Sequence, residues 1–437
     1  MKALNNHGVN KICCIGAGYV GGPTMVVFAD KCPHIEFHVL DINEEKIKAW
    51  NSIDLTKLPV YEPGLDQIVN RCRGRNLFFS TDIETNIATS DMIFISVNTP
   101  TKTEGHGAGQ AIDLKWVDAS ARKISEFATG ETIVVEKSTL PVKTAQTIKE
   151  ILESSNINQT SNKKFHVLSN PEFLAEGTAI NDLIDPDRVL IGGSNQEAIN
   201  ALSNIYSFWI DKSKIITTNL WSAELSKLIA NAFLAQRVSS INSVTAICEA
   251  TGSSTKDVSL AVGKDKRIGK HFLNPGPGFG GSCFKKDILN LVYICNHYGL
   301  YEVSEYWQQI ININNWQKKR ITKLIINKLF GTISEKNIAI FGFAFKANTN
   351  DTRESPAITI ALELLNEGAF LRIYDPKVNY LQIENDLTGN NKKETDQFKK
   401  KNWQYFEDIY NCAMGADAIV IFTEANEFQK IDWSRIS

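Results

Sequence analysis

A glycine-rich turn close to the N-terminus constrains the fold of this chain most. Gly16-Ala17-Gly18-Tyr19-Val20-Gly21 follows a short apolar strand expected over Lys11–Ile15 and opens a helix expected over Val20–Ala29. In such a turn the first glycine permits a tight bend and the second lets the backbone approach a pyrophosphate. The third glycine lets the helix pack closely on the strand. Glycines also mark purely structural turns, but this context favours a dinucleotide-binding fold.

An acidic residue ends the next predicted strand. Asp41 follows the strand Phe37–Leu40 and lies 20 residues after Gly21. Its carboxylate can accept hydrogen bonds from ribose hydroxyls and would repel a 2′-phosphate. The unpaired amides at the start of the helix would bind the phosphates. We therefore expect NAD, rather than NADP, as the cofactor.

The first and last thirds of the chain alternate strand and helix patterns, which is typical of parallel, doubly wound sheets. Further strands are predicted at Asp91–Val97, Thr132–Glu136, Asn337–Phe341 and Leu371–Tyr374, and helices at 43–50, 114–127 and 356–368. Residues 416–422 repeat the apolar pattern of residues 90–96. The fold class is therefore predicted to be α/β, with two Rossmann-like, doubly wound domains.

The middle of the chain is predicted to be helical and to join these domains. Trp221–Ala250 has apolar residues at a helical period and is followed by Gly252 as a stop signal, and Lys286–Phe330 looks helical with an interruption near Gly299. We expect domains at residues 1–218, 219–330 and 331–437. The polar, lysine-rich segment Asn379–Lys401 is expected to be a surface insertion.

Composition excludes several classes of partner. The 437 residues carry a formal net charge of −2, so no global basic field exists to hold nucleic acid or an anionic membrane. No apolar run is long enough for a membrane span, and Met1–Asn10 lacks the features of a signal peptide, which predicts a cytoplasmic protein. The eight cysteines should be reduced, and their scattered spacing does not fit a metal site.

Cys283 has the most unusual surroundings. It follows Asn274–Ser282, a segment with four glycines and two prolines, and it lies where this loop enters a predicted helix. A helix N-terminus favours the thiolate, which is the nucleophilic form of cysteine. A small buried cysteine at a helix start is the structural alternative.

Two further groups of polar residues are candidates for chemistry. Lys227 and Asn231 are four residues apart and share one face of the long helix, where they could stabilise an oxyanion or simply form a solvated face. Asn170–Gly177 supplies two carboxylates, Glu172 and Glu176, in a turn after a strand. Either carboxylate could be a base or the acid of a helix N-terminus.

Several strings in register resemble the UDP-glucose/GDP-mannose dehydrogenase family. These strings are Ile15–Pro23, Ile95–Thr101, Glu136–Thr139, Ser169–Gly177, Leu225–Ile241, Gly278–Phe284 and Phe341–Lys346. They extend from about Lys11 to near the C-terminus, and together they are far more specific than any one motif.

The resemblance implies oxidation of UDP-glucose to UDP-glucuronate by two NAD molecules in succession. The C6 alcohol would become an aldehyde, Cys283 would capture it as a thiohemiacetal, and a second oxidation would give a thioester that water hydrolyses. By the same resemblance, Lys227 would stabilise the oxyanion with support from Asn231, Asp287 and Thr139 would place a water, and Glu172 would be the base in hydrolysis.

The resemblance also assigns binding residues. The cofactor residues would be Gly16, Gly18, Tyr19, Val20, Gly21, Asp41, Lys46, Thr99, Pro100, Thr101, Ser138, Thr139, Glu176 and Arg353. The residues that hold the UDP-sugar would be Glu172, Phe173, Leu174, Ala175, Glu176, Lys227, Asn231, Arg267, Phe272, Leu273, Phe279, Gly280, Phe345 and Lys346. The C-terminal domain would bind the uridine nucleotide, and no metal is expected.

Two departures from the family pattern bear on these expectations. Asn274–Gly278 replaces the lysine, alanine, serine and valine that animal members tend to have before the glycine, which could loosen sugar selection. The chain stops at Ser437, where family members continue with another strand that carries a substrate-contacting arginine. The last domain is therefore expected to be truncated, with weaker binding of the UDP-sugar or lower stability.

Two alternatives and an assembly state complete the expectations. GDP-mannose or UDP-N-acetylmannosamine is the alternative substrate. An alternative of another class is a non-catalytic, truncated subunit that binds nucleotide or pairs with a full-length partner. The resemblance further implies a homodimer across the long helix, which animal-type members assemble into hexamers.

Overall fold

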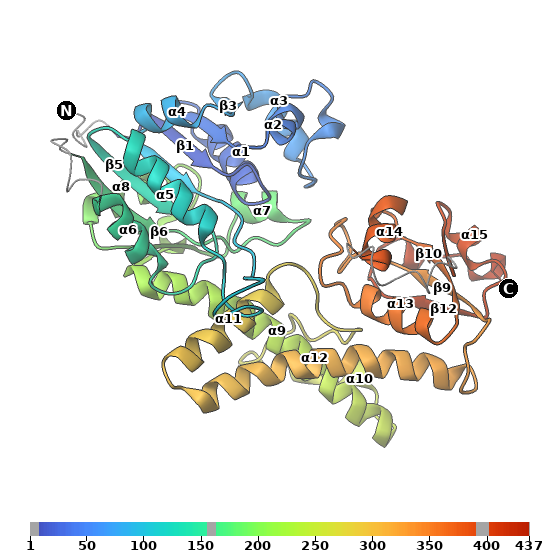
Figure 1. Ribbon diagram of the computed structural model, residues 1–437. Coiled ribbons are helices and arrows are strands. Elements are labelled where there is room, and N and C mark those ends of the chain that lie inside the picture. Colours follow the sequence, from blue (N-terminus) through green and yellow to red (C-terminus); the bar gives the residue numbers. More distant parts are fainter. Residues whose placement is uncertain (1–7, 155–162, 390–401, 437) are drawn as a thin grey trace. The chain divides into compact units, whose positions relative to one another are not determined.

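The computed structural model describes residues 8–154, 163–389 and 402–436, and the chain divides into two compact units, Met1–Ile229 and Ala230–Ser437 (Figure 1). Residues 1–7, which make up most of the segment predicted to lack a signal peptide, lie outside the described residues.

The first unit is built on one sheet of eight strands in the order β3-β2-β1-β4-β5-β6-β7-β8. The strands are β1 Lys11–Ile15, β2 Glu36–Leu40, β3 Leu77–Ser80, β4 Met92–Ile95, β5 Glu131–Glu136, β6 Lys164–Ser169, β7 Val189–Gly193 and β8 Ile215–Thr218. Neighbours pair parallel except β6 with β7. In the register of the sheet, Ile15 of β1 lies between Leu40 of β2 and Ile95 of β4. From β1 the strand order runs to one side through β2 and β3 and to the other side through β4 and β5. In such sheets ligands bind beyond the carboxyl ends of the two strands where the order changes side, which here are β1 and β4.

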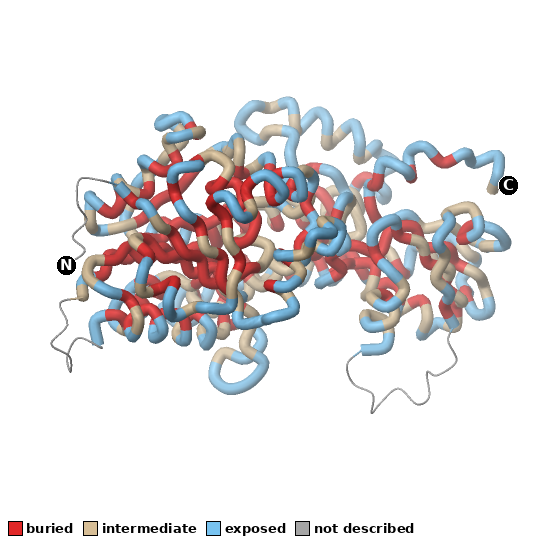
Figure 2. The backbone as a smooth tube through the Cα atoms, turned by 90° about the horizontal axis from the view of Figure 1, so that it is seen from above, coloured by how far each residue is buried: buried red, intermediate tan, exposed pale blue. Residues whose placement is uncertain are grey.

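Helices cover both faces of this sheet, because strands buried on both sides need two apolar layers. They are α1 Gly21–Lys31, α2 Glu44–Trp50, α3 Leu65–Cys72, α4 Ile83–Thr89, α5 Lys115–Phe127, α6 Thr144–Ser154, α7 Ala179–Ile184 and α8 Gln196–Tyr206, with short 3-10 turns η1 Leu55–Lys57 and η3 Lys212–Lys214. Within β5, Ile133 and Val135 join the core under α1, α7 and α8, whereas Val134 joins the core under α5 and α6. Figure 2 shows buried segments in the interior of the part of the chain that contains the N-terminus, with exposed segments around them.

The predicted helical middle is confirmed as α9 Leu220–Thr251, α10 Thr255–Lys264, α11 Phe284–His297 and α12 Tyr301–Lys328. Gly252 follows α9 with φ +77°, and Gly299 lies between α11 and α12 with φ +71°. Glycine suits both positions because a left-handed backbone conformation strains other residues.

The last hundred residues of the second unit repeat the doubly wound pattern, as predicted. Four parallel strands have the order β11-β10-β9-β12, with β9 Asn337–Phe341, β10 Phe370–Tyr374, β11 Trp403–Tyr405 and β12 Ala418–Ile421. The helices are α13 Pro356–Asn366, α14 Tyr380–Thr388 and α15 Ile409–Ala413, with 3-10 turns η4 Phe428–Lys430 and η5 Trp433–Arg435.

The expected surface insertion over Asn379–Lys401 is wrong in its first part. Residues 380–388 form α14, and Ile383 is fully buried in the core around β9 and β10. Tyr380 and Leu387 pack against the same core. These three apolar residues follow a helical spacing that the surrounding charges obscured in the sequence. Residues 390–401 lie outside the described residues.

Candidate active site

The turn between β1 and α1 is tightly packed on one side and open on the other. Gly16 has φ +110°, and a Cβ built there would lie 2.1 Å from the carbonyl oxygen of Ser96. A Cβ on Gly21 would lie 2.0 Å from the carbonyl oxygen of Gly16. By contrast, nothing lies within 4 Å of a Cβ on Gly18. The backbone at Gly18 is therefore the part of the turn that a pyrophosphate can approach.

Asp41 is held ionised beside this turn. Its Oδ2 accepts hydrogen bonds from the Ala17 amide at 3.0 Å and from Lys46 Nζ at 2.8 Å, and its Oδ1 accepts one from the Asn43 amide at 3.0 Å. Burial alone would raise the pKa of Asp41, but these donors, Lys46 foremost, hold the pKa below its usual range. A fixed negative charge at this position fits a ribose with free hydroxyls and opposes a 2′-phosphate.

The loops that follow β4 and β5 meet beside the same turn of the sheet. Thr99 Oγ1 donates to the carbonyl oxygen of Thr139 at 3.2 Å, and Ser138 Oγ donates to that of Val97 at 2.8 Å. Thr101 forms an isolated bridge with Ile112. The structure thus brings the predicted residues 99–101 together with Ser138 and Thr139.

A buried ion pair joins two of the predicted catalytic residues. Lys227 Nζ lies 3.1 Å from Glu172 Oε1, and the two side chains are 4% and 8% exposed. Glu172 Oε2 also accepts the Leu174 amide at 2.6 Å, and Lys227 Nζ lies 5.4 Å from the centre of the Phe173 ring. The alternative of a solvated helix face is therefore excluded for Lys227. Glu172 lies in the loop between β6 and α7, so it is not the acid of a helix N-terminus.

The remaining predicted residues of this loop are more accessible. Ala175 is exposed and Glu176 is half-buried, and both precede the first turn of α7. Tyr19 and Val20 are half-buried at the start of α1.

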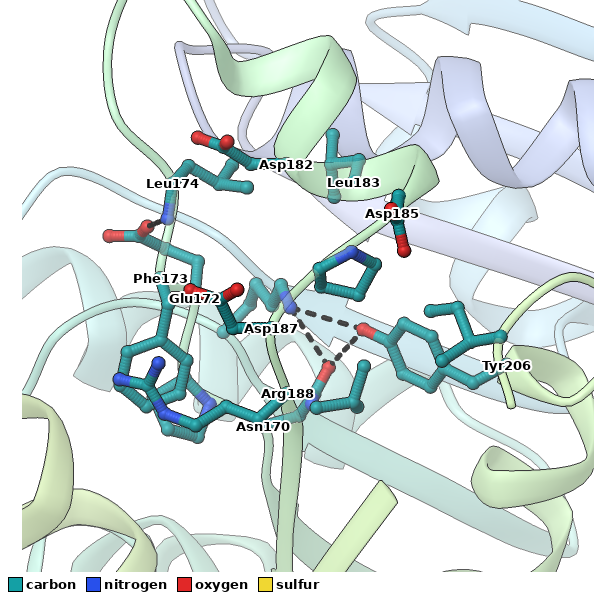
Figure 3. Close-up of a pocket in the computed structure, with 15 residues that line it drawn as sticks. Asn170, Glu172, Phe173, Leu174, Asp182, Leu183, Asp185, Asp187, Arg188 and Tyr206 are labelled. Carbon is teal, nitrogen blue, oxygen red and sulfur yellow. Dashed lines mark hydrogen bonds between the residues drawn. The ribbon is translucent and has the colours of Figure 1, made fainter. Parts of the chain in front are cut away.

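A cavity of about 110 Å³ adjoins Glu172 (Figure 3). Lys137 Nζ lies in its wall and donates to Asn170 Oδ1 at 3.0 Å and to the Tyr206 hydroxyl at 3.2 Å, and that hydroxyl donates to Asn170 Oδ1 at 2.7 Å. Burial lowers the pKa of Lys137 to about 8, and the charge of Glu172 opposes this shift. Sequence reasoning missed Lys137 and Tyr206. A lysine directly after the apolar strand β5 was the signal that could have revealed the first of them.

In the second unit, Cys283 is the N-cap residue of α11 and is half-buried, whereas the other seven cysteines are buried. Cys283 is therefore not the fully buried structural cysteine of the alternative interpretation. Its Sγ lies 3.5 Å from Ser282 Oγ, and its carbonyl oxygen accepts the Asp287 amide at 2.8 Å. All eight cysteines lie in the described ranges and are thiols.

Asp287 and Asn231, two of the residues to which the resemblance assigns catalytic roles, are joined by a hydrogen bond. Asp287 is fully buried in the first turn of α11, and its Oδ2 accepts a hydrogen bond from Asn231 Nδ2 at 2.6 Å. Asn231 is itself buried on α9. This bond fixes the amide of Asn231 and the carboxylate of Asp287 one helical turn from Cys283.

The glycines before Cys283 let its loop lie directly against residues 345–354. A Cβ on Gly280 would lie 2.7 Å from the carbonyl oxygen of Glu354 and 2.9 Å from Phe345 Cβ. The Gly281 amide donates to the carbonyl oxygen of Arg353 at 2.8 Å. Phe279 exchanges two hydrogen bonds with the side chain of Asn314, at 2.8 Å and 3.1 Å. The predicted residues Phe279, Gly280, Phe345 and Arg353 therefore share one neighbourhood.

The other predicted binding residues of the second unit are less closely tied to this neighbourhood. Lys346 Nζ lies 5.4 Å from the centre of the Phe345 ring, and the Arg353 guanidinium pairs with Asp351. Leu273 is buried, and Phe272 is 43% exposed with φ +59°. Within the described ranges, the hydrogen bonds of the Arg267 side chain go to Asp265, so they do not connect Arg267 with another predicted site residue.

No helix of the described residues is long and apolar enough to cross a membrane. No group of three or more histidine, cysteine, aspartate or glutamate side chains in the same part of the chain could hold a metal ion.

Comparison with known proteins gives matches along almost the whole chain. Residues 10–210 match the NAD binding domain of the UDP-glucose/GDP-mannose dehydrogenase family, residues 221–316 its central domain and residues 339–437 its UDP binding domain. The chain is 57% identical over 430 residues to UDP-glucose 6-dehydrogenase of Drosophila melanogaster, with 98% of this chain and 89% of that protein covered.

A plant relative and a solved structure give the same result. UDP-glucose 6-dehydrogenase 3 of Arabidopsis thaliana is 54% identical over 438 residues, with 98% of this chain and 90% of that protein covered. A UDP-glucose dehydrogenase from the hyperthermophilic archaeon Pyrobaculum islandicum superposes with a TM-score of 0.85 at 28% identity, with 99% of this chain and 94% of that one covered.

Proposed function

This chain belongs to the UDP-glucose/GDP-mannose dehydrogenase family, and from that premise we propose that it oxidises UDP-glucose to UDP-glucuronate. Its first domain is an NAD binding domain, and NAD is the cofactor. The observation that carries the proposed chemistry is the half-buried Cys283 thiol at the N-cap of α11, after a loop in which a Cβ on Gly278 or Gly280 would meet other atoms at less than 3 Å.

The overall reaction fixes what the site has to provide. One sugar alcohol, two NAD⁺ and one water give one carboxylate, two NADH and three protons. When bound, NAD would supply the hydride acceptor for each of the two oxidations. The chain has to bind the alcohol, remove protons from it and from water, and hold the partly oxidised sugar between the two oxidations.

Cys283 would hold the intermediate. The dipole of α11 favours its thiolate, which adds to the aldehyde carbon and forms a thiohemiacetal. That adduct still carries a hydrogen that can leave as hydride, so the second oxidation gives a thioester. Water then cleaves the carbon–sulfur bond, which releases the carboxylate and restores the thiolate.

The Lys227–Glu172 pair supplies a cation and a carboxylate for the proton and charge transfers. The ammonium of Lys227 would stabilise oxygen as it gains negative charge, with Asn231 as a second donor. The carboxylate of Glu172 would take a proton from the hydrolytic water, which Asp287 and Thr139 would orient. The ion pair holds both groups in one geometry, because each is buried and is the charged neighbour of the other.

Substrate binding is proposed for Phe173, Leu174 and the residues around Phe279, Gly280 and Phe345, with the uridine nucleotide in the UDP binding domain at residues 339–437. The same proposal includes a cytoplasmic location, which the eight thiols support because a reducing compartment keeps them so.

The test is the amount of NADH released per UDP-glucose by the purified chain and by Cys283→Ser. We expect two NADH per sugar from the unchanged chain and a failure of the serine variant to complete both oxidations. Cys295→Ser is the matched control, because Cys295 is a buried thiol on the same helix. Two NADH per sugar from Cys283→Ser would contradict the thioester route.

Substrate choice is tested in the same assay. UDP-glucose should be turned over with a higher kcat/KM than GDP-mannose or UDP-N-acetylmannosamine. A preference for either of those sugar nucleotides would contradict the proposed substrate. A folded chain that binds NAD but releases no NADH would favour a non-catalytic subunit.

A further inference from the structure

Two buried glutamates face each other where β5 ends and α9 begins. Glu136 is the last residue of β5 and is 2% exposed, and Glu224 lies in the first turns of α9 and is 3% exposed. Glu136 follows Val134 by two residues, so its side chain points to the same face of the sheet, toward α5 and α6. The first unit contains both residues, and the proposed reaction uses neither.

Glu224 binds the backbone that leads into α6. Its Oε1 accepts the Ala145 amide and its Oε2 accepts the Lys143 amide, both at 2.7 Å. Lys143 has φ +78°, a conformation that a residue other than glycine adopts only when its surroundings stabilise it. Two short bonds from backbone amides favour the ionised form of Glu224.

The surroundings of Glu136 favour its protonated form instead. Within the described residues no donor group gives its Oε2 a hydrogen bond. Burial, and then the charge of Glu224, raises the pKa of Glu136 well above its usual range. Burial raises the pKa of Glu224 as well, although the amides of Ala145 and Lys143 oppose this. The two carboxyl groups are in side-chain hydrogen-bond contact. A hydrogen bond between two carboxyl groups requires a proton on one of them, and the backbone amides that donate to Glu224 favour Glu136 as the protonated partner.

Two lysines and a cysteine lie close to this pair along the chain or in the neighbouring apolar cluster. The Lys143 ammonium lies 5.5 Å from the centre of the Trp221 ring. Lys137, the neighbour of Glu136, points to the opposite face and bonds Asn170 and Tyr206. Cys13 lies in the same apolar cluster as Val134, and burial raises the pKa of its thiol to about 12, so it stays neutral.

We propose that Glu136 donates one shared proton to Glu224 and that this bond fixes the start of α9 against the segment of residues 137–145. That segment carries Ser138 and Thr139, and α9 carries Lys227 one turn after Glu224. Glu136 and Glu224 are thus positioning residues for groups from two elements. Loss of the shared proton at alkaline pH leaves two repelling carboxylates and releases the segment from the helix.

The shared proton has a consequence for stability that does not depend on the enzyme's activity. Above pH 4.5 the unfolded chain loses the Glu136 proton while the folded chain retains it. Stability therefore falls as pH rises, until the folded protein also loses the proton. A side chain that donates the same hydrogen bond but has no proton to lose removes this dependence.

Glu136→Gln in the full chain provides that side chain. The unfolding temperature of Glu136→Gln minus that of the unchanged chain should increase as pH rises above 4.5, by roughly 2–4 °C per pH unit for as long as the folded chain keeps the proton. Glu150→Gln, at an exposed carboxyl of α6, is the matched control and should show no such trend. A difference that stays constant with pH would overturn the proposal. Failure of Glu136→Gln to fold would overturn it too, because the amide reproduces the shared hydrogen bond.

Glu224→Gln separates the two partners. Its side-chain nitrogen replaces one of the two accepting oxygens and cannot accept a hydrogen bond from a backbone amide, so we expect a lower unfolding temperature at every pH. A Glu224→Gln variant as stable as the unchanged chain would contradict the role of the carboxylate.

A second readout rests on the proposed function. NADH formation by the unchanged chain should fall reversibly at alkaline pH, whereas Glu136→Gln should retain its rate there. Equal losses in both would contradict the positioning role. If the unchanged chain released no NADH at all, the proposed function would fail while the unfolding temperatures still decided the state of the carboxyl pair.

Discussion

Lys137 shows what burial does to one charged residue in this protein. The strand β5 places its side chain in the wall of the cavity beside Glu172, where Asn170 and Tyr206 provide neutral acceptors. Burial of the ammonium costs free energy that these two hydrogen bonds offset only in part. The pKa of Lys137 is consequently about 8, compared with 10.5 for an exposed lysine.

The lowered pKa of Lys137 predicts an opposite pH dependence from that of Glu136. Between pH 8 and 10.5 the unfolded chain holds the Lys137 proton more tightly than the folded chain does, so stability rises with pH. Lys137→Met has no group that titrates at this position, so this increase in stability with pH is absent from the variant. Its unfolding temperature relative to the unchanged chain should therefore decrease between pH 8 and pH 10, by roughly 2–4 °C per pH unit. Thermal unfolding measures this, and a difference that does not change over that range would show that the folded lysine keeps an ordinary pKa.

At the scale of elements, the glycines of the β1–α1 turn are needed for two different reasons. Gly16 and Gly21 have backbone atoms where a Cβ would be, so they are needed for the turn to pack. Gly18 has open space in that direction, so a methyl group there would disturb the fold little. The same turn therefore contains glycines required by packing and one required by the ligand.

This difference predicts two distinct phenotypes. Gly16→Ala should lower the free energy of unfolding by about 1–3 kcal/mol because of its strained φ and the clash with Ser96. Gly18→Ala should leave the unfolding temperature nearly unchanged but raise the Kd of NAD by about tenfold, which corresponds to ~1.4 kcal/mol. Calorimetry on both variants measures stability and binding. A Gly18→Ala variant that binds NAD normally would show that the pyrophosphate does not lie against this turn.

At the scale of the whole molecule, the second unit exposes large apolar side chains on its helices. Phe233 and Ile247 of α9 are 52% and 62% exposed, and Leu260 of α10 and Tyr306 of α12 are 60% and 50% exposed. Subunit interfaces bury exposed apolar side chains of this kind. We propose that a second copy of the chain covers them in a homodimer.

Light scattering during gel filtration tests this assembly. The unchanged chain should elute with at least twice its monomer mass of 48.8 kDa. Ile247→Asp should shift the chain toward the monomer, because the interface would have to bury a charge. Ile53→Asp, at a 95% exposed residue of the first unit, should not change the mass. A monomeric unchanged chain would refute the dimer, and a mass of six chains would indicate the hexamer that the family resemblance allows.

The elements that the sequence predicted best are those with strong local patterns. The β1–α1 turn, α9 and the stops at Gly252 and Gly299 depend on neighbours only a few residues away, and a helical or strand period makes them visible. The helix α14 was missed, because three apolar residues among charges give a weak period. The strands β7 and β8 were also missed, since short apolar runs resemble other buried segments.

The sequence by itself determined the α/β fold class, the NAD turn at Gly16–Gly21 and the place of Cys283 at a helix start, because each depends on residues that are neighbours along the chain. Only the tertiary structure decided the pairs Lys227–Glu172, Asn231–Asp287 and Glu136–Glu224. The Asn231–Asp287 bond alone joins residues that are 56 positions apart. Burial, which raises the pKa values of the Glu136–Glu224 pair and removes water from the Lys227–Glu172 pair, exists only once the distant segments have packed together.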